Sequence, residues 1–359
     1  NLFILVSTDA AGMSYLRIVP SVNVIRIETR YWDIEQEESY LLRRQDGEEE
    51  LYWAWDERKD SLRADGSFEP AILHYAVNRP AGAQWGESDL APLAEQVRVG
   101  DRQTANRFIV QPMEGFDAVD NGGPSDLSFR RYARFAAGGS SLLWFEATAI
   151  LHEARSNPRQ LWLHAGSADL FARLVEATRK TAREALGREL ILVVQLTHSG
   201  RYSRPGGVAR PIIAHHSEIL DPRHGLSADY PLVTDDYLDR LQDTYVEAAR
   251  LAARAGFDGV DVKSCHRYLV SELLASHTRE GRYGGPFENR TRFLREVMER
   301  IRGEVPGLFV TTRMNVYDAI SYPYGFGVST EDYREPDLRE PIELIRGLRR
   351  FDMPLVNVT

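Results

Sequence analysis

The sequence predicts an α/β fold: a TIM-type (β/α)8 barrel, of which about six strands are visible, preceded by a small β-rich region. After residue 93, short apolar segments alternate with longer segments whose apolar residues recur at helical spacing, as in a parallel sheet covered by helices. The apolar segment 257–262 also places Val260 and Val262 on one side, and Asp261 and Lys263 on the other. In a barrel the valines would lie under the helices. The charged pair would point inward near the carboxyl end of the strand, where such barrels keep their chemistry.

Composition narrows the classes of partner and compartment. The 359 residues carry a net charge of -9, which argues against a nucleic-acid partner, and no run of about 18 apolar residues suggests a membrane span. The single cysteine, Cys265, excludes an internal disulfide, so we expect a cytoplasmic protein. The first apolar run has no basic region or Met before it, and we interpret it as an internal strand rather than a signal peptide. The sequence leaves open whether the chain forms a homo-oligomer.

Residues 1–85 have a pattern of their own, with short strand-like stretches separated by acidic turns. We expect a β-rich region here, joined by a linker near residues 78–83 to the barrel at 93–359. Its tryptophans fit the core of a small β domain, and a stacking platform for sugars or bases is the alternative. They are Trp32, Trp53, Trp55 and Trp85.

The first half of the barrel region contains three predicted strands and two helices. A strand at 106–113 is followed by a helix at 126–137, which two glycines end. The near-continuous apolar run 142–148 predicts a second strand buried on both faces. A helix at 168–186 and a third strand at 189–196 follow. The segment 203–234 is rich in Pro, Gly and His and is too long for an ordinary connection, which indicates a lid or rim over a site.

The second half repeats the same alternation. A helix is expected at 235–255, then the strand 257–262, and then a helix from Glu288 with apolar residues at helical spacing. A fifth strand at 308–315, a helix at 341–350 and a sixth strand at 353–358 complete the sequence. A closed barrel of this type has eight strands, so we expect two to be missing, together with much of a phosphate-binding site.

Four segments carry a resemblance to a known family. The longest match begins at the end of the 257–262 strand and continues into the next helix. It comprises Lys263, His266–Leu269, Arg279, Gly281, Tyr283–Pro286, Glu288–Arg290, Arg292 and Phe293. The others are Asn106–Met113, Glu146–Thr148 and Gln195–Arg201, and Arg313 stands in a fifth position of the pattern. Together they resemble the old yellow enzyme family of flavin-dependent ene-reductases.

The chain departs from the family pattern at several positions. Lys263 replaces a His, Arg267 a Gly, Gly281 an Asp and Pro286 a Ser. At Glu114 the family commonly has a small group beside the flavin. A carboxylate there would disfavour the reduced, anionic flavin, and a surface-facing Glu114 is the alternative.

The resemblance implies an oxidoreductase in which FMN accepts hydride from NADH or NADPH and then reduces a small-molecule activated alkene, such as an α,β-unsaturated carbonyl. Tyr268 would protonate the α-carbon, while Lys263 and His266 would hold the carbonyl oxygen. The residues that the resemblance assigns to the flavin site are Pro112, Met113, Glu114, Ala147, Gln195 and Arg313. An ion pair with Asp261 is the structural alternative for Lys263, and a salt bridge to Asp or Glu is the alternative for Arg313.

Two other functions remain open from the sequence. A flavin-free barrel that serves as a binding or scaffold protein would explain the departures. A glycoside hydrolase would use Glu146 and Asp261 as its carboxylate pair. The three histidines of the 203–234 segment match no closed set of metal ligands, so no metal site is predicted. They are His215, His216 and His224.

Overall fold

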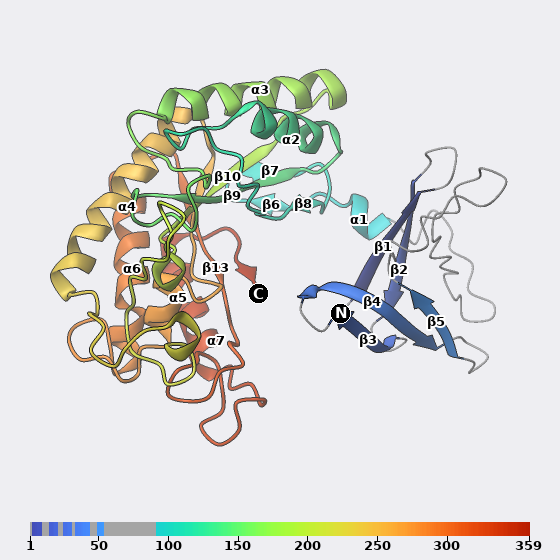
Figure 1. Cartoon of the computed structure of the whole chain (residues 1–359). Coiled ribbons are helices and arrows are strands. Elements are labelled where there is room, and N and C mark those ends of the chain that lie inside the picture. Colours follow the sequence, from blue (N-terminus) through green and yellow to red (C-terminus); the bar gives the residue numbers. More distant parts are fainter. Residues whose placement is uncertain (1, 9–13, 21–23, 31–32, 44–48, 54–90) are drawn as a thin grey trace. The chain divides into compact units, whose positions relative to one another are not determined.

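The computed structural model describes residues 2–8, 14–20, 24–30, 33–43, 49–53 and 91–359, and the chain divides into two units, Asn1–Asp89 and Leu90–Thr359 (Figure 1). The first unit is β-rich, as predicted. Its strands β1 (Leu2–Thr8) and β2 (Ser14–Pro20) form an antiparallel hairpin. The strands β3 (Val24–Arg30), β4 (Asp33–Arg43) and β5 (Glu49–Trp53) form an antiparallel sheet. The packing of the four tryptophans and the expected linker lie outside what the structure describes.

The second unit is built on a parallel sheet whose strands follow one another in chain order, β8-β9-β10-β11-β12. Its members are β8 (Ile109–Val110), β9 (Leu142–Ala149), β10 (Ile191–Thr197), β11 (Gly259–Val262) and β12 (Phe309–Thr311). The chain continues from β12 into β13 (Arg313–Met314), which pairs in parallel with β14 (Asn357–Val358). This consecutive parallel order is the one that the alternation of strands and helices predicted.

The predicted fifth strand, 308–315, is interrupted at Thr312. The Thr312 hydroxyl donates to the carbonyl oxygen of Val262 (2.7 Å), and beyond it the backbone pairs with Ser264 instead of β11 itself. The alternation of apolar residues gave no sign of this break. It turns the start of β13 towards the end of β11, where the polar side chains of the site begin.

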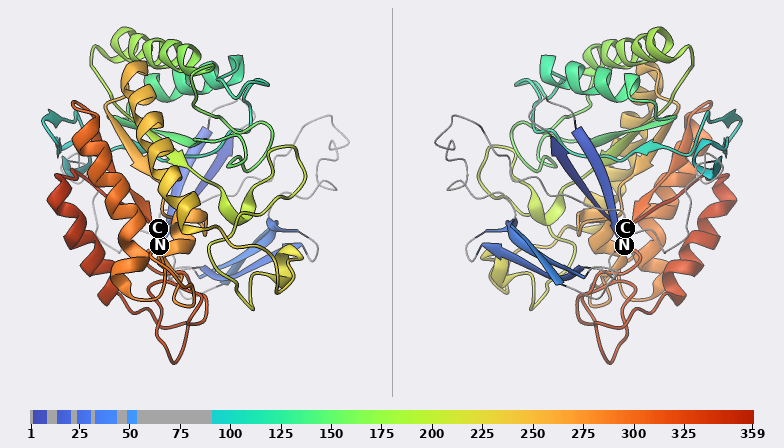
Figure 2. Two further views of the ribbon diagram at one scale, coloured as in Figure 1. Left: turned by 90° about the vertical axis from the view of Figure 1, so that its left-hand side faces the viewer. Right: turned by 90° about the vertical axis from the view of Figure 1, so that its right-hand side faces the viewer.

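Long helices connect the strands and cover the outside of the sheet (Figures 1 and 2). They are α2 (Asp126–Ala137), α3 (Ala168–Leu186), α4 (Asp235–Ala255), α6 (Phe287–Glu304) and α7 (Arg339–Leu348). The side chain of Thr234 accepts the N–H of Tyr237 at the start of α4, and left-handed glycines end α3 and α4. No described helix has the length and apolar character needed to cross a membrane.

Several short elements were not predicted from the sequence. They are α1 (Ala91–Ala94), the hairpin of β6 (Arg98–Val99) and β7 (Arg102–Gln103), α5 (Leu269–Leu274), and the 3-10 helices η4 (Gly200–Tyr202), η5 (Pro222–His224) and η6 (Arg349–Phe351). Each is too short for its apolar residues to show the repeat of a helix or a strand. The helix α5 matters most, because it begins directly after Tyr268.

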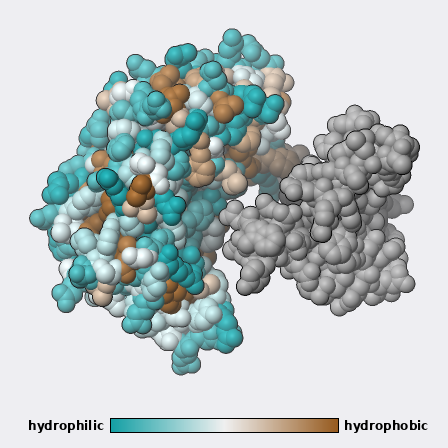
Figure 3. All heavy atoms as spheres, viewed as in Figure 1, coloured by the Kyte–Doolittle hydropathy of each residue, from teal (hydrophilic) through white to brown (hydrophobic). Residues whose placement is uncertain are grey.

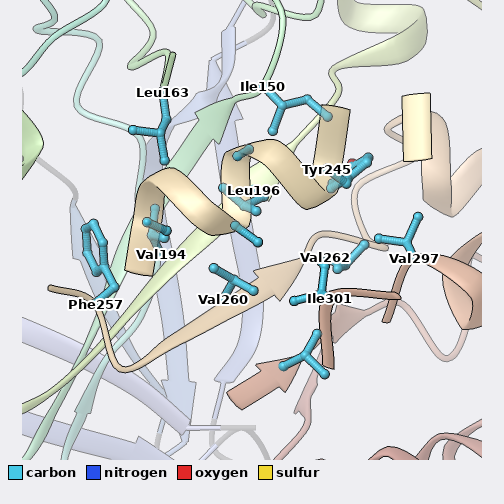
Figure 4. Packing of buried hydrophobic residues seen from close by; sticks show 14 of the residues in the cluster. Ile150, Leu163, Val194, Leu196, Tyr245, Phe257, Val260, Val262, Val297 and Ile301 are labelled. Carbon is cyan, nitrogen blue, oxygen red and sulfur yellow. The ribbon is translucent and has the colours of Figure 1, made fainter. Parts of the chain in front are cut away.

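Apolar residues separate into two layers on either side of the parallel sheet. Val260 and Val262 belong to the large cluster between the sheet and the helices, which also contains Tyr245 of α4 and Val297 of α6 (Figure 4). A smaller cluster on the other face contains Val99, Leu142, Trp144, Ile191 and Val193. The predicted orientation of β11 is therefore correct. Outside this core, the visible face of the second unit is mostly hydrophilic with separate apolar side chains (Figure 3).

The long segment 203–234 is tied down by a buried arginine. Arg201 donates to Asp221 (2.5 Å), to Glu272 of α5 (2.6 Å) and to the carbonyl oxygen of His215 (3.0 Å). Glu272 also accepts the N–H of Ala214 (2.9 Å). The segment is thus fixed to the helix that follows Tyr268.

Candidate active site

The predicted site residues come from the carboxyl ends of successive parallel strands. Glu114 follows β8, Ala147 and Gln195 lie in β9 and β10, Lys263 follows β11 and Arg313 begins β13. Because parallel strands present these ends at one edge of the sheet, residues far apart in the sequence meet there. The structure brings most of them together around two carboxylates, Asp261 and Glu114.

Asp261 is fully buried and ties four strands together. Its carboxylate accepts hydrogen bonds from Trp144 Nε1 (2.9 Å), Gln195 Nε2 (2.5 Å) and the backbone N–H of Arg313 (2.6 Å). Burial raises the pKa of Asp261 to about 6, against the opposing effect of these donors and of Lys263. The carboxylate is therefore occupied by structural donors.

The side chain of Glu146 lies on the side of the sheet that α2 covers. Its carboxylate lies against α2, where it contacts Arg131 and Tyr132 Oη (3.2 Å) and accepts the N–H of Gly115 (2.7 Å). Glu146 and Asp261 thus belong to separate hydrogen-bonding networks, each already filled by donors. The structure gives no support to the carboxylate pair that a glycoside hydrolase would need.

Lys263, Tyr268 and Glu114 form a compact cluster. The Nζ atom of Lys263 lies 3.7 Å from the centre of the Tyr268 ring and 3.5 Å from Oε1 of Glu114. Tyr268 Oη donates to the same Oε1 (3.1 Å), and Ser156 Oγ donates to Oε2 (3.0 Å). Among the described residues, the ion-pair partner of Lys263 is therefore Glu114, and the proposed pair with Asp261 was wrong. Glu114 is also not surface-facing, since only 13% of its side chain is exposed.

The chain turns sharply between Lys263 and Tyr268. Both His266 and Arg267 have left-handed backbone conformations, with φ of 61° and 55°, which are uncommon for such residues. The N–H of His266 donates to Asn315 Oδ1 (3.2 Å), and Arg267 donates to the carbonyl oxygen of Asp318 (3.1 Å). This turn places the His266 ring edge-on to the Tyr268 ring, 6.4 Å between centres.

Electrostatics favours the neutral form of His266. Desolvation of the partly exposed His266 ring, followed by the nearby charges of Lys263, Arg313 and Arg267, lowers the pKa of His266 to about 4. Burial raises the pKa of the adjacent Cys265 thiol to about 12. At neutral pH the site therefore offers a neutral imidazole and an un-ionised thiol, with Lys263 as a nearby cation.

The side chain of Arg313 has the properties expected of a cation that binds a ligand. Within residues 91–359 no carboxylate forms a salt bridge with it, and its Nε atom is buried without a hydrogen-bond partner. Its Nη1 atom reaches the carbonyl oxygen of Pro112 at 3.4 Å, so the ends of β8 and β13 approach each other. Next to Pro112, Met113 is 72% exposed. A buried unpaired N–H beside an exposed apolar surface suits a flat ligand that carries an oxygen acceptor.

Ala147 and Gln195, which are also predicted to contact the flavin, are buried in strands β9 and β10. Ala147 is buried in β9, where its side chain is a single methyl group. Gln195 is almost fully buried, and one N–H of its side-chain amide donates to Asp261, which leaves the second N–H and the carbonyl oxygen for other partners. Gln195 therefore still carries both a donor and an acceptor, as the predicted contact with the flavin requires.

Two residues of the cluster were not found from the sequence. Ser156 reaches Glu114 from the loop after β9, and no motif marked it. Tyr202 lies with its ring centre 5.7 Å from that of Tyr268. Its position directly after the Gln195–Arg201 motif was a signal that could have found it. The described residues contain no group of three His, Cys, Asp or Glu side chains that could hold a metal ion. His215 instead contacts Ser276, and His216 contacts Asp221.

The sequence of this chain matches those of known proteins. The NADH:flavin oxidoreductase / NADH oxidase family matches residues 92–326. An NADPH dehydrogenase of Clostridium acetobutylicum is 28% identical over 246 residues, which are 67% of this chain and 64% of that enzyme. An NADH:flavin oxidoreductase of Gibberella zeae is 25% identical over 317 residues, 84% of this chain and 73% of that protein.

Solved structures agree with the fold. The old yellow enzyme of Pichia sp. superposes with a TM-score of 0.62 at 23% identity, over 74% of this chain and 70% of that enzyme. The predicted TIM-type barrel is confirmed for the part of the chain after residue 90. The chain covers slightly less than two thirds of the Clostridium enzyme's length.

Proposed function

Since this chain belongs to the NADH:flavin oxidoreductase / NADH oxidase family, we propose that it is an FMN-dependent oxidoreductase that takes hydride from NADH or NADPH and reduces an activated alkene. The observation that carries the proposal is the meeting of Tyr268, Lys263 and His266 at the carboxyl ends of the strands, with Arg313 beside them. The substrate class is an α,β-unsaturated carbonyl compound or a related alkene.

The residues at the strand ends suit the isoalloxazine ring of FMN. Arg313 would hold a ring oxygen through its unpaired N–H, and its fixed charge would stabilise the negative charge that reduction creates. Gln195 would offer the ring its carbonyl oxygen and its second amide N–H, while Pro112, Met113 and Ala147 would provide apolar contacts. When bound, FMN supplies a hydride carrier between the nicotinamide and the alkene.

The protein's own residues would handle the substrate's oxygen and the proton. Lys263 and His266 donate hydrogen bonds to the carbonyl oxygen, which polarises the alkene and makes its β-carbon the position that receives hydride. His266 can do so as a neutral donor, because its pKa is lowered to about 4. Tyr268 gives its phenolic proton to the α-carbon. The double bond becomes a single bond, with one hydride and one proton added.

A flavin-free binding or scaffold protein remains the second candidate, because the substitutions at Lys263, Arg267 and Glu114 fall within the site. Visible absorption of the purified chain mixed with FMN separates the two. We expect bound flavin absorption, bleaching by NADH or NADPH under anaerobic conditions, and recovery of the colour on adding 2-cyclohexenone. Failure to bind both FMN and riboflavin would support the scaffold, because riboflavin lacks the phosphate and does not depend on the strands that are expected to be missing. A loaded chain that oxidises nicotinamide without reducing the enone would limit the function to flavin reduction.

A further inference from the structure

Two side chains to which the proposed function gives roles on the substrate both contact one atom of Glu114. Tyr268 Oη donates to Glu114 Oε1 (3.1 Å), and Lys263 Nζ lies 3.5 Å from the same oxygen. Ser156 Oγ donates to the other oxygen, Oε2 (3.0 Å). These three groups come from the start of α5, the end of β11 and the loop after β9. The fold therefore fixes the carboxylate beside the donors that would meet a substrate.

The charges of Glu114 and Lys263 are largely shielded from water. Only 13% of the Glu114 side chain and 3% of the Lys263 side chain are exposed. Solvent screens charges weakly in such a place, so each charge acts strongly on a group bound nearby. An oxygen hydrogen-bonded to Lys263 Nζ would lie about 3 Å from it, and so within about 7 Å of Glu114 Oε1. An anionic ligand would thus be attracted by one charge and repelled by the other.

Two other cations of residues 91–359 lie near the cluster, and each has another role. Arg267 donates to the carbonyl oxygen of Asp318 (3.1 Å). Burial raises the pKa of the Asp318 carboxyl, and the charge of Arg267 opposes this rise. Arg313 is the cation that the proposed function gives to the flavin. His266 has a pKa of about 4 and is therefore neutral at neutral pH. The charge that an acceptor's oxygen meets is therefore set mainly by Lys263 and Glu114 together.

We propose that Glu114 is a specificity-determining residue that makes the site select a neutral alkene, an unsaturated aldehyde or ketone, over an unsaturated carboxylate. The inference rests on the proposed function, in which Lys263 binds the acceptor's oxygen. Lys263 alone would favour a carboxylate, because an ammonium binds an anion more strongly than a neutral carbonyl. The ionised Glu114 beside it repels a carboxylate, whereas a carbonyl oxygen keeps its hydrogen bond. The preference comes from a fixed pair of charges and requires no change of protonation.

Two compounds of nearly the same shape test the inference, 1-cyclohexene-1-carboxaldehyde and 1-cyclohexene-1-carboxylate. Calorimetric titration of the FMN-loaded protein at neutral pH measures their affinities, so the lower intrinsic reactivity of the carboxylate does not enter. In wild type the aldehyde should bind more tightly. In Glu114→Gln the affinity of the carboxylate relative to that of the aldehyde should rise by about 10-fold or more, as expected for one partly screened pair of charges at this separation. Adding Lys263→Met to Glu114→Gln should remove the gain.

A matched control is Glu153→Gln, which changes an exposed carboxylate that contacts Tyr237 (2.7 Å), and this variant should keep the wild-type ratio of affinities. Urea unfolding shows whether each variant is folded. If Glu114→Gln is not, Glu114→Ala removes the same charge without placing an amide among the three donors. An unchanged ratio in the folded variant, or tighter binding of the carboxylate by wild type, would overturn the inference.

Binding and reduction are measured separately, so the two proposals fail separately. If the affinities change as expected but the aldehyde is not reduced with NADH or NADPH, the proposed function fails while the selection by Glu114 stands. If the aldehyde is reduced and the ratio of affinities is the same in wild type and Glu114→Gln, only the selection fails. If the chain takes up no flavin, the same titrations of the unloaded chain decide the inference, and binding of neither compound would overturn it.

Discussion

Lys263 lies under an aromatic ring, beside one carboxylate and near a second. The chain contains only Lys59, Lys180 and Lys263 as lysines among its 44 basic residues, so an inward-facing lysine was a signal for a special role. The structure buries this lysine, and its ion-pair partner is Glu114 rather than Asp261. Alternation along β11 put Asp261 on the same face, yet Asp261 is taken by Trp144, Gln195 and the Arg313 backbone. Those donors come from other strands, which a single strand's pattern cannot reveal.

Replacing Tyr268 by Phe should separate the two half-reactions. Without the phenolic proton, alkene reduction should slow by about 10²-fold or more, which is what a positioned acid typically contributes. Flavin reduction by NADH or NADPH should stay nearly unchanged, because it uses no proton from Tyr268. Stopped-flow kinetics measures both steps, and an equal effect on both would mean that Tyr268 only shapes the site.

Lys263 should affect substrate binding more than folding. Lys263→Met removes a hydrogen bond from a charged donor to the carbonyl oxygen, for which about 1.5–3 kcal/mol is typical, so enone affinity should fall about 10- to 100-fold. Lys263→His places an imidazole N–H donor at this position and should recover part of that affinity. Enone titration of the FMN-loaded protein gives the affinities, and urea unfolding serves as the control. If Lys263→Met is strongly destabilised but binds the enone as wild type does, the pair with Glu114 is the whole role of this lysine.

Helices long enough to show a repeating pattern of apolar residues were predictable from the sequence. Short elements that hydrogen bonds hold in place were not. The helices α2, α3 and α4 lie at the predicted ranges, and α6 begins one residue early, at Phe287. The short helix α5 and the break at Thr312 depend on hydrogen bonds to distant backbone atoms. The segment 203–234 could be recognised as unusual from its length, but the buried network of Arg201, Asp221 and Glu272 that anchors it appears only in the structure.

The anchoring of this segment should weaken in acid because of His215. Burial, followed by the charge of Arg201, lowers the pKa of His215 to about 3, whereas an unfolded histidine titrates near 6.5. A base with a lowered pKa in the folded state contributes its full stability above about pH 6.5 and loses it as the pH falls towards 3. The loss at pH 5 should be about 2 kcal/mol from this group alone.

His215→Asn tests this without removing the contact. The side-chain amide N–H of Asn can replace the ring Nδ1–H that lies 2.9 Å from Ser276 Oγ, whose own proton goes to the carbonyl oxygen of Glu272. We expect urea unfolding at pH 7 to show a modest loss of stability in the variant, and the gap to wild type to close or reverse at pH 5. His224→Asn, at a less buried histidine of the same segment, is the matched control. A constant difference between His215→Asn and wild type at both pH values would contradict the predicted titration.

At the scale of the whole molecule, the sequence predicted two regions from their different spacing of apolar residues, one ending at residue 85 and the other beginning at residue 93. The structure's own division of the chain lies between Asp89 and Leu90. The family match begins at residue 92 and so covers only the second unit. The sequence could not give the strand pairing of the first unit, because antiparallel register depends on turns and cross-strand contacts that a period of two leaves open.

The second unit should fold and hold its site without the first. Its two hydrophobic clusters and every contact described around Glu114, Asp261 and Arg313 come from residues 91–359, and a unit with its own core is expected to be stable by itself. A protein consisting of residues 91–359 should therefore give the same urea midpoint as the corresponding transition of the whole chain. If the whole chain binds FMN, the shorter protein should bind it with an affinity within about threefold, a difference of less than 1 kcal/mol.

Both proteins must be compared in one buffer, with circular dichroism for unfolding and flavin fluorescence for binding. A lower midpoint, or loss of FMN binding only in the shorter protein, would mean that residues 1–90 stabilise or complete the barrel and that the two units work as one.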